Sequence, residues 1–183
     1  MQALTAVPLP EPGAARFAAA CPGHRLARAA SLPFALGLVL PLLARTAPFA
    51  RAPLGLRVPL TAGELARGHH LIVLRDGAVA GYAGWVACTT EQGQRFLGPD
   101  GIKALDFARS EAEPIAFLTW TAIDTAAMTA LKTAMRALYP RQRYFARRSH
   151  AGAEDAPARP VVPRGGIITP LTGTPLTETP ATP

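Results

Sequence analysis

The chain has 183 residues and a formal net charge of +7, and 49% of its residues are hydrophobic. This length is typical of one domain, and the apolar content is enough to build a core. The two cysteines show no paired spacing, which gives no sign of a disulfide framework and favours a reducing compartment. The positive charge is compatible with an acidic protein, nucleic acid or an anionic membrane, and it does not choose among these partners.

Residues 1–13 are rich in proline and alanine and are predicted to form a flexible lead before a short helix over residues 14–20. Cys21-Pro22-Gly23 ends that helix, because proline and glycine both disfavour helical backbone. His24 is therefore expected on a loop or a helix end, where a side chain can point into a cleft. Taken alone, it is more typical of a surface histidine, and Cys21 is more typical of a small buried residue than of a nucleophile.

The segment from Leu32 to Leu43 is a dense apolar run, and Ser31 stands in the position of an N-cap, so a helix is predicted over residues 32–44. A membrane-spanning helix needs about 20 apolar residues, which favours a buried core helix over a span or a targeting segment. Pro41 is expected to kink or shorten this helix.

Residues 46–60 contain three prolines and a glycine, and they are predicted to form a loop. Thr61 and Glu64 follow with the spacing of a capping box, in which the two side chains satisfy backbone N–H groups at the start of a helix. A short helix that ends near Gly68 is therefore expected.

Residues 71–88 give the clearest strand signal. An apolar run precedes Asp76-Gly77, which is a strong signal for a two-residue hairpin turn. Glycines inside a strand usually mark a bulge or the close approach of another group. For Gly81 and Gly84 that group is either a pantetheine arm, as in acyl-transfer folds, or a packed helix. The alternation predicts Val79, Gly81, Ala83 and Trp85 on one face and Tyr82 and Val86 on the other.

The second half of the chain predicts a short helix from Thr90 to about Leu97, a central strand over residues 115–121, and an amphipathic helix that begins at Asp124 or Thr125. Pro140 ends that helix, and residues 141–147 alternate as a half-exposed strand near an edge. Residues 151–183 are rich in proline, threonine and alanine and are expected to be a largely disordered tail. These elements together predict a mixed α/β domain of the α+β class.

Motifs for metal or phosphate chemistry are missing from the sequence. His69 and His70 are adjacent, so in a strand they face opposite ways and cannot bind one metal together, and no metal site is expected. The main electrostatic feature is a basic cluster, which is usually a solvated face but would also suit an acidic protein or phosphates. Its members are Lys132, Arg136, Arg141, Arg143, Arg147 and Arg148.

Three stretches in this order resemble the toxin-activating lysine acyltransferases, the family of the hemolysin-activating acyltransferase. The first is Cys21-Pro22-Gly23-His24-Arg25, followed by the apolar segment with its Leu40-Pro41. The second is Leu71–Trp85, which ends in Tyr82-Ala83-Gly84-Trp85. The third is Phe117-Leu118-Thr119-Trp120, then a helix, Leu138-Tyr139-Pro140 and Tyr144–Arg148. No single motif is specific, but their order and spacing over roughly residues 15–168 are.

The resemblance implies a fold similar to the GNAT acetyltransferases over residues 14–150, with a central, mostly antiparallel sheet flanked by helices and a loop insertion at 46–67. It also implies a cytoplasmic enzyme without a bound cofactor, often a homodimer. Such enzymes take a fatty acyl group from acyl carrier protein and transfer it to internal lysines of an RTX protoxin. Acyl carrier protein is acidic, which would give the basic cluster a partner. Neither nucleic acid nor a membrane span is expected.

The resemblance also implies the catalytic residues. His24 falls on the family's essential histidine, and an imidazole is well suited to remove a proton from a lysine ammonium. The family's catalytic aspartate falls at Thr119, which can exchange hydrogen bonds but carries no negative charge. We expect both side chains to face one cleft, and Asp124 could supply the missing charge if its loop folds back.

Two further hypotheses follow from the same residues. The loss of the aspartate at Thr119 would suit a non-catalytic relative that only binds a carrier protein or a toxin. The positive charge would suit a nucleic-acid-binding domain, whose affinity should fall steeply with salt.

Overall fold

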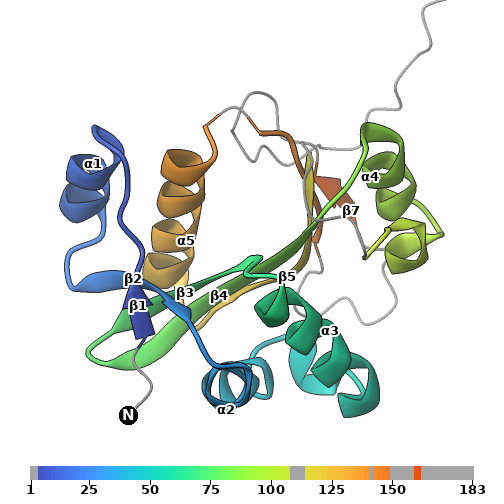
Figure 1. Ribbon diagram of the computed structural model, residues 1–183, viewed down its shortest axis with the longest axis horizontal. Coiled ribbons are helices and arrows are strands. Elements are labelled where there is room, and N and C mark those ends of the chain that lie inside the picture. Colours follow the sequence, from blue (N-terminus) through green and yellow to red (C-terminus); the bar gives the residue numbers. More distant parts are fainter. Residues whose placement is uncertain (1–3, 108–113, 141, 149–158, 162–183) are drawn as a thin grey trace, which may run out of the picture.

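The computed structural model describes residues 4–107, 114–140, 142–148 and 159–161. A seven-stranded sheet runs through the molecule, with its strands in chain order from β1 to β7 (Figure 1). All neighbouring strands are antiparallel except β5 and β6, which are parallel. The strands are β1 (Leu4–Ala6), β2 (His24–Ala29), β3 (His70–Arg75), β4 (Ala78–Ala87), β5 (Ile115–Ala122), β6 (Tyr144–Arg148) and β7 (Arg159–Val161). The predicted α+β class, with a central and mostly antiparallel sheet, is confirmed.

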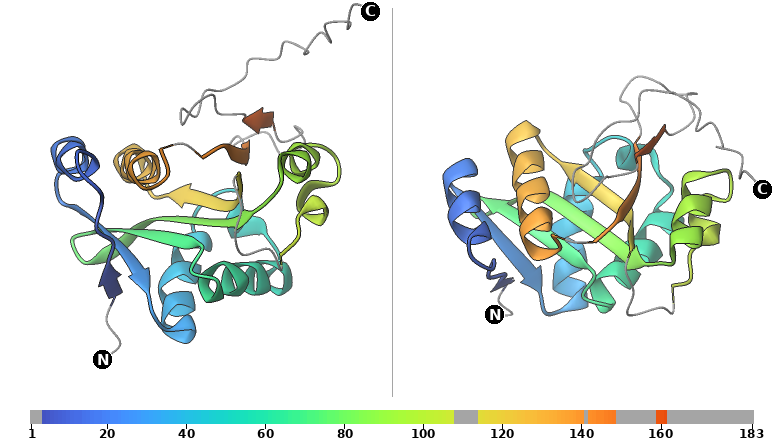
Figure 2. Two further views of the ribbon diagram at one scale, coloured as in Figure 1. Left: turned by 45° about the horizontal axis from the view of Figure 1, so that its top comes forward. Right: turned by 90° about the horizontal axis from the view of Figure 1, so that it is seen from above.

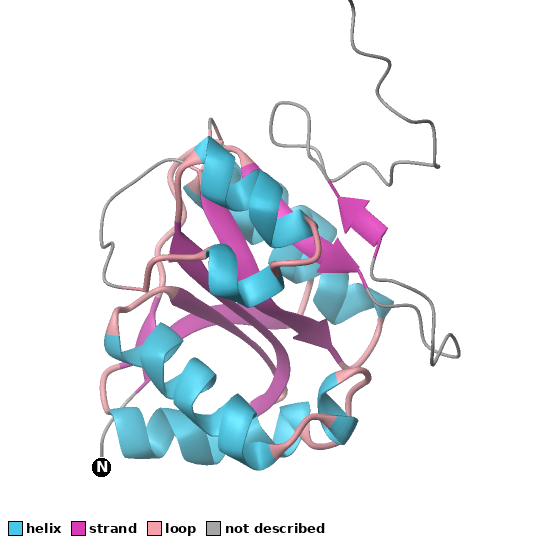
Figure 3. Cartoon of the chain, turned by 90° about the vertical axis from the view of Figure 1, so that its right-hand side faces the viewer, coloured by secondary structure: helices cyan, strands magenta, loops and turns pink. Residues whose placement is uncertain are grey.

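Helices cover both faces of this sheet. The helices are α1 (Gly13–Ala20), α2 (Leu32–Leu43), α3 (Leu54–Ala66), α4 (Thr90–Leu97) and α5 (Thr125–Leu138), with short 3-10 helices η1 (Phe49–Arg51) and η2 (Gly101–Ala104). α1 and α5 lie on one face and α2 and α3 on the other, as Figures 2 and 3 show. α4 and η2 pack farther along, near β5 and β6. No helix within the described residues has the length and apolar character needed to cross a membrane.

The β3–β4 hairpin forms as predicted, with Asp76 and Gly77 both at positive φ. The prediction of which sheet face each β4 side chain occupies is wrong for one residue. Val79 lies on the α2/α3 face with Tyr82, rather than on the α1/α5 face with Trp85. The register shifts so that Val73 pairs with Gly81 and Leu74 with Val79, which leaves Ala80 as an extra residue in β4. This β-bulge reverses the side-chain alternation on its turn side.

The loop predicted over residues 46–60 is wrong from residue 54 onward, because α3 begins at Leu54 and contains Pro59. Thr61 is therefore an interior helical residue, and Glu64 does not form the predicted capping box with it. Pro59 removes one helical hydrogen bond, but tertiary packing overrides local propensity here. The buried positions have helical spacing and are mostly polar, so an apolar pattern could not reveal them. They are Arg57, Thr61, Glu64 and Leu65.

Both terminal boundaries need correction as well. Leu4–Ala6, placed in a flexible lead by the sequence, forms edge strand β1 beside β2. Arg159–Val161, placed in a disordered tail, forms β7 beside β6. The rest of the tail from residue 162 lies outside the described residues. Most remaining elements form as predicted: α1, α2 with Pro41 inside it, α4 with a capping box at Thr89, β5 and α5.

Leu131 on α5 provides a test of this packing. Its side chain is fully buried against β4, beside Gly81. Truncation to alanine should lower the free energy of unfolding by about 2–5 kcal/mol, because it removes buried apolar contacts and leaves a cavity. Lys132→Ala, one residue along the same helix, should change it by less than about 0.5 kcal/mol. Urea denaturation followed by circular dichroism measures both values, and equal effects would contradict the assigned face of α5.

Candidate functional site

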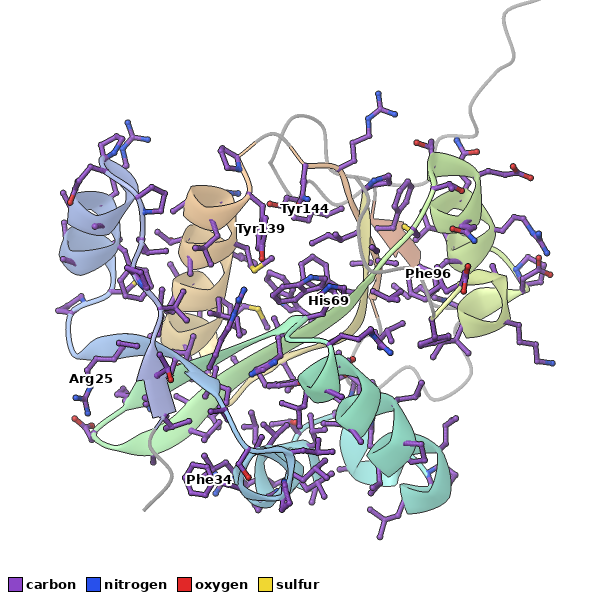
Figure 4. The ribbon with its side chains drawn as sticks, viewed as in Figure 1. Arg25, Phe34, His69, Phe96, Tyr139 and Tyr144 are labelled. Carbon is purple, nitrogen blue, oxygen red and sulfur yellow. The ribbon has the colours of Figure 1, made fainter. Side chains whose placement is uncertain are left out.

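The structure does not bring His24 and Thr119 together. His24 pairs with Arg75 at one end of β3, whereas Thr119 pairs with Gly84, which pairs with His70 at the other end. Five positions of β3 separate these two rows, which is about 16 Å along the strand. In Figure 4, Arg25, the neighbour of His24, lies at one end of the molecule, and His69 lies near its centre.

The two side chains also lie on opposite faces of the sheet. Leu26, two residues after His24, belongs to the core beneath α1 and α5, so His24 shares that face. Thr119 forms hydrogen bonds with residues of α3 on the other face. The expectation of one cleft holding both residues is therefore wrong, and so is a mechanism in which they act on one reacting group.

Neither Cys21 nor Asp124 restores a catalytic arrangement around His24 or Thr119. Its Nδ1 lies 3.2 Å from the backbone oxygen of Pro22. Cys21 is buried, and burial raises the pKa of its thiol, which agrees with a packing residue rather than a nucleophile. Asp124 does not fold back toward Thr119: it accepts a hydrogen bond from the Ala127 N–H as the N-cap of α5 and pairs with Arg75 at 2.7 Å.

Thr119 instead joins a buried polar cluster that contains a carboxylate, defined here as Arg57, Glu64, Tyr82 and Thr119. The Thr119 hydroxyl donates to Oε1 of Glu64 at 2.8 Å. The Tyr82 hydroxyl donates to Oε2 of Glu64 at 2.9 Å. Both carboxylate oxygens are thus satisfied, which is how a buried charge becomes tolerable.

Arg57 completes the cluster from one side. Its Nη2 donates to the Thr119 oxygen at 3.0 Å. The Thr119 hydroxyl therefore accepts a hydrogen bond from the cation and donates one to the Glu64 carboxylate. The guanidinium also lies over the ring of Phe49 in η1, 4.9 Å from its centre. All four cluster residues are buried, with Glu64 and Thr119 both 0% exposed. The cluster is closed to solvent in this conformation.

The glycines of β4 explain how α3 approaches the sheet so closely. A Cβ atom at Gly84 would overlap the Glu64 carboxylate. A Cβ atom at Gly81, on the opposite face, would lie 3.1 Å from Cδ1 of Leu131 in α5. The alternative of a packed helix at each glycine is therefore confirmed, and the space at Gly84 holds a side chain of the protein rather than a pantetheine arm.

Burial dominates the electrostatics of the cluster. It raises the pKa of Glu64 to about 7, against hydrogen bonds from Thr119 and Tyr82 and the charge of Arg57, which lower it. Burial and the adjacent Glu64 raise the pKa of Tyr82 well above its ordinary value, so the phenol stays a donor. A carboxylate with a pKa near neutrality can accept or release a proton at physiological pH, which is the property of a general base.

His70 lies at the end of β3, on the side of the sheet that faces α2 and α3. Its Nε2 accepts the backbone N–H of Ala29 at 3.2 Å, and burial lowers its pKa to about 4, so it is neutral. His69 points to the other face, where its ring stacks on Trp85, as the strand alternation predicts. Three buried polar atoms of this region have no partner among the described residues: Nε of Arg57, Oγ1 of Thr61 and Nδ1 of His70.

Sequence reasoning missed the roles of Arg57, Glu64 and Tyr82. A glycine inside a strand at position 84 signalled a close approach, and Tyr82 and Thr119 lie on the same face of neighbouring strands. Glu64 was instead assigned to a capping box at the start of a short helix, because the first part of α3 contains Pro59 and was predicted as a loop.

Comparison with known proteins adds no assignment: no family model and no curated protein matches the chain. Within the part of the chain that the structure describes, no group of three or more histidine, cysteine, aspartate or glutamate side chains could hold a metal ion.

Glu64 and His70 predict opposite effects of pH on stability. The folded pKa of Glu64, about 7, exceeds its ordinary 4.5, so its contribution to stability falls as pH rises through that window. The folded pKa of His70, about 4, lies below its ordinary 6.5, so its contribution rises with pH over 4 to 6.5. Relative to wild type, the unfolding free energy of Glu64→Gln should gain about 1.4 kcal/mol per pH unit between pH 5 and 6, and that of His70→Gln should lose as much. Urea titrations at several pH values measure both slopes, and parallel profiles would contradict these pKa directions.

The two glycines give a matched test of how tightly α3 is seated. Gly84→Ala should lower the free energy of unfolding by about 1–3 kcal/mol more than Gly81→Ala, because the new methyl displaces a hydrogen-bonded carboxylate. At Gly81 the nearest atom is the mobile end of Leu131, which can shift. Thermal or urea unfolding compares the two variants, and equal losses would show that the Glu64 carboxylate is not held against β4.

Proposed function

We propose that the protein is a cytoplasmic protein-lysine acyltransferase of GNAT-like fold, related to the toxin-activating acyltransferases, with Glu64 in place of the family's aspartate. The observation that carries this proposal is the hydrogen bond between the Thr119 hydroxyl and Glu64 Oε1. The position that the resemblance assigns to an aspartate holds a threonine, yet a carboxylate from α3 lies next to it. This carboxylate supports the proposal, because it would supply from another element the negative charge that Thr119 lacks.

The arrangement of the sheet is compatible with this relationship. A mostly antiparallel sheet has one parallel pair, β5 and β6, whose connection is α5. β6 pairs with β5 only over Ile115–Phe117, so Thr119 lies beyond the paired stretch.

The proposed reaction is the aminolysis of a thioester carried by acyl carrier protein. Glu64 accepts a proton from the lysine ammonium, and the neutral amine attacks the acyl carbonyl. The C–N bond forms as the C–S bond breaks, the thiolate of the carrier takes up the excess proton of the new amide nitrogen, and Glu64 then releases its own proton to solvent. A base with a pKa near 7 is well matched to this task. Because Glu64 is fully buried, the reaction requires α3 to move away from β4.

A second candidate function is a non-catalytic module that binds an acidic carrier protein or an RTX toxin. The observation that favours it is the closure of the polar cluster, together with the separation of His24 from Thr119. Lys132 and Arg136 lie one turn apart on α5, while the Arg147 guanidinium lies against Gly101 of η2. Arg141 and the Arg148 side chain lie outside the described residues.

Co-expression with an RTX protoxin, followed by mass spectrometry of tryptic peptides, tests the proposal. We expect fatty-acylated lysine with the wild type, and a loss of about 10²–10⁴-fold with Glu64→Gln, because the base is removed while the hydrogen bonds remain possible. Glu91→Gln on the exposed face of α4 is the matched control and should retain full activity.

The other outcomes separate the alternatives. Loss of activity in His24→Ala but not in Glu64→Gln would return the base to His24 and reject Glu64. If no variant attaches an acyl group but the protein still binds acyl carrier protein or toxin, the non-catalytic binding module is supported and the enzyme is rejected. If moderate salt abolishes the capture of these proteins and the binding of nucleic acid alike, the binding is due to a general charge effect alone.

A further inference from the structure

The outer side of α3 carries a pocket that the proposed reaction does not use. Its volume is about 330 Å³, and its apolar lining consists of Leu56, Pro59, Leu60 and Phe107, with backbone from two glycines of α3. This volume lies at the lower end of the range of about 300–1,000 Å³ for small-molecule sites. Leu56 is 56% exposed and the nearby Leu54 is 69% exposed, so the apolar surface continues outward from the pocket.

One charged side chain, Arg67, also lines this pocket. Its guanidinium lies 5.6 Å from the centre of the Phe107 ring and against Gly63. Two of its nitrogens, Nε and Nη2, are buried and form no hydrogen bond with any described residue. Glu64 exerts its charge on Arg67, but both oxygens of that carboxylate already accept hydrogen bonds from Thr119 and Tyr82.

Arg67 is half-buried, and its two buried nitrogens without a hydrogen-bond partner are costly; burial also lowers the pKa of its guanidinium. An anion that entered the pocket would neutralise the charge and satisfy the open donors. The planar fork of a guanidinium matches the two oxygens of a carboxylate. The remaining lining offers a ligand almost nothing except apolar contact, so the rest of the ligand should be hydrocarbon.

We propose that this pocket binds a free alkyl carboxylate, with the carboxylate on Arg67 and the chain along Leu56, Leu60 and Phe107. An acyl chain held as a thioester could offer the same hydrocarbon, but it lacks the charge that Arg67 would neutralise. The inference stands apart from the acyl transfer proposed above, because it concerns the outer side of α3 and is tested without an acyl donor or acceptor.

Isothermal titration of the purified full chain at pH 8 with dodecanoate tests this proposal. Three other probes are compared: acetate, dodecyltrimethylammonium, and the uncharged thioester S-dodecanoyl-N-acetylcysteamine. We expect saturable binding of dodecanoate, with each of the other three probes weaker by about tenfold or more, because only dodecanoate supplies both a chain and a negative charge.

Two variants probe the two ends of the site. Arg67→Gln should weaken dodecanoate by about tenfold or more and leave the thioester unchanged, whereas Arg16→Gln, an exposed arginine on α1, should have no effect. Gly55→Leu should weaken every long-chain probe by about tenfold or more. A Cβ at Gly55 meets no atom within 4 Å, so the new side chain fills open space without disturbing the fold.

Several results would overturn the proposal. They are equal affinity for the cationic and anionic long-chain probes, equal affinity for the thioester and the carboxylate, unchanged dodecanoate binding in Gly55→Leu, and no saturable binding at all. Far-ultraviolet circular dichroism of Arg67→Gln shows whether a loss of binding has a folding cause, and in that case the comparison of probes on the wild type decides the result alone.

Discussion

The carboxylate of Glu64 is the constraint on which this half of the molecule depends. A carboxyl group with no exposed surface must have its oxygens satisfied, since an unpaired buried charge is very unfavourable. Tyr82 and Thr119 satisfy them from two neighbouring strands, and Arg57 satisfies the Thr119 oxygen in turn. Because those donors are fixed in the sheet, the carboxylate fixes α3, and the absence of a side chain at Gly84 allows α3 to come near enough.

The alternation of side chains across the sheet divides the protein into two different environments. The face beneath α1 and α5 is apolar, with Leu71, Trp85 and Leu131 in one continuous core. The face beneath α3 carries the polar cluster in its middle and apolar contacts on either side. The position of a residue in its strand thus decides whether its side chain lies on the apolar face or on the face with the polar cluster. His24 begins β2 on the apolar side, and no change of rotamer can carry an imidazole through a sheet to Thr119.

The sequence was sufficient wherever local signals and tertiary packing agree. The Asp76-Gly77 turn and the apolar stripe of α5 each predicted an element that forms. It failed where packing overrides local preference. α3 keeps Pro59 because its inner stripe is buried, and that stripe is mostly polar, so neither propensity nor hydrophobic periodicity indicates a helix. The bulge at Ala80, which moves Val79 to the other face, has only the neighbouring Gly81 as a local signal, and a glycine in a strand does not distinguish a bulge from a close approach. Since the candidate site rests on α3, its central residue was beyond prediction.

The pairing of Glu64 with Thr119 restricts which residue types position 119 can hold. Two carboxylates in hydrogen-bond contact inside a protein cannot both be ionised, and one pKa rises strongly. An aspartate at position 119 would therefore compete with Glu64 for Tyr82 and Arg57 instead of adding a useful charge. A threonine avoids this conflict, because it donates to Glu64 and accepts from Arg57 with a single oxygen. Threonine therefore suits a strand position that receives a buried carboxylate from a neighbouring helix.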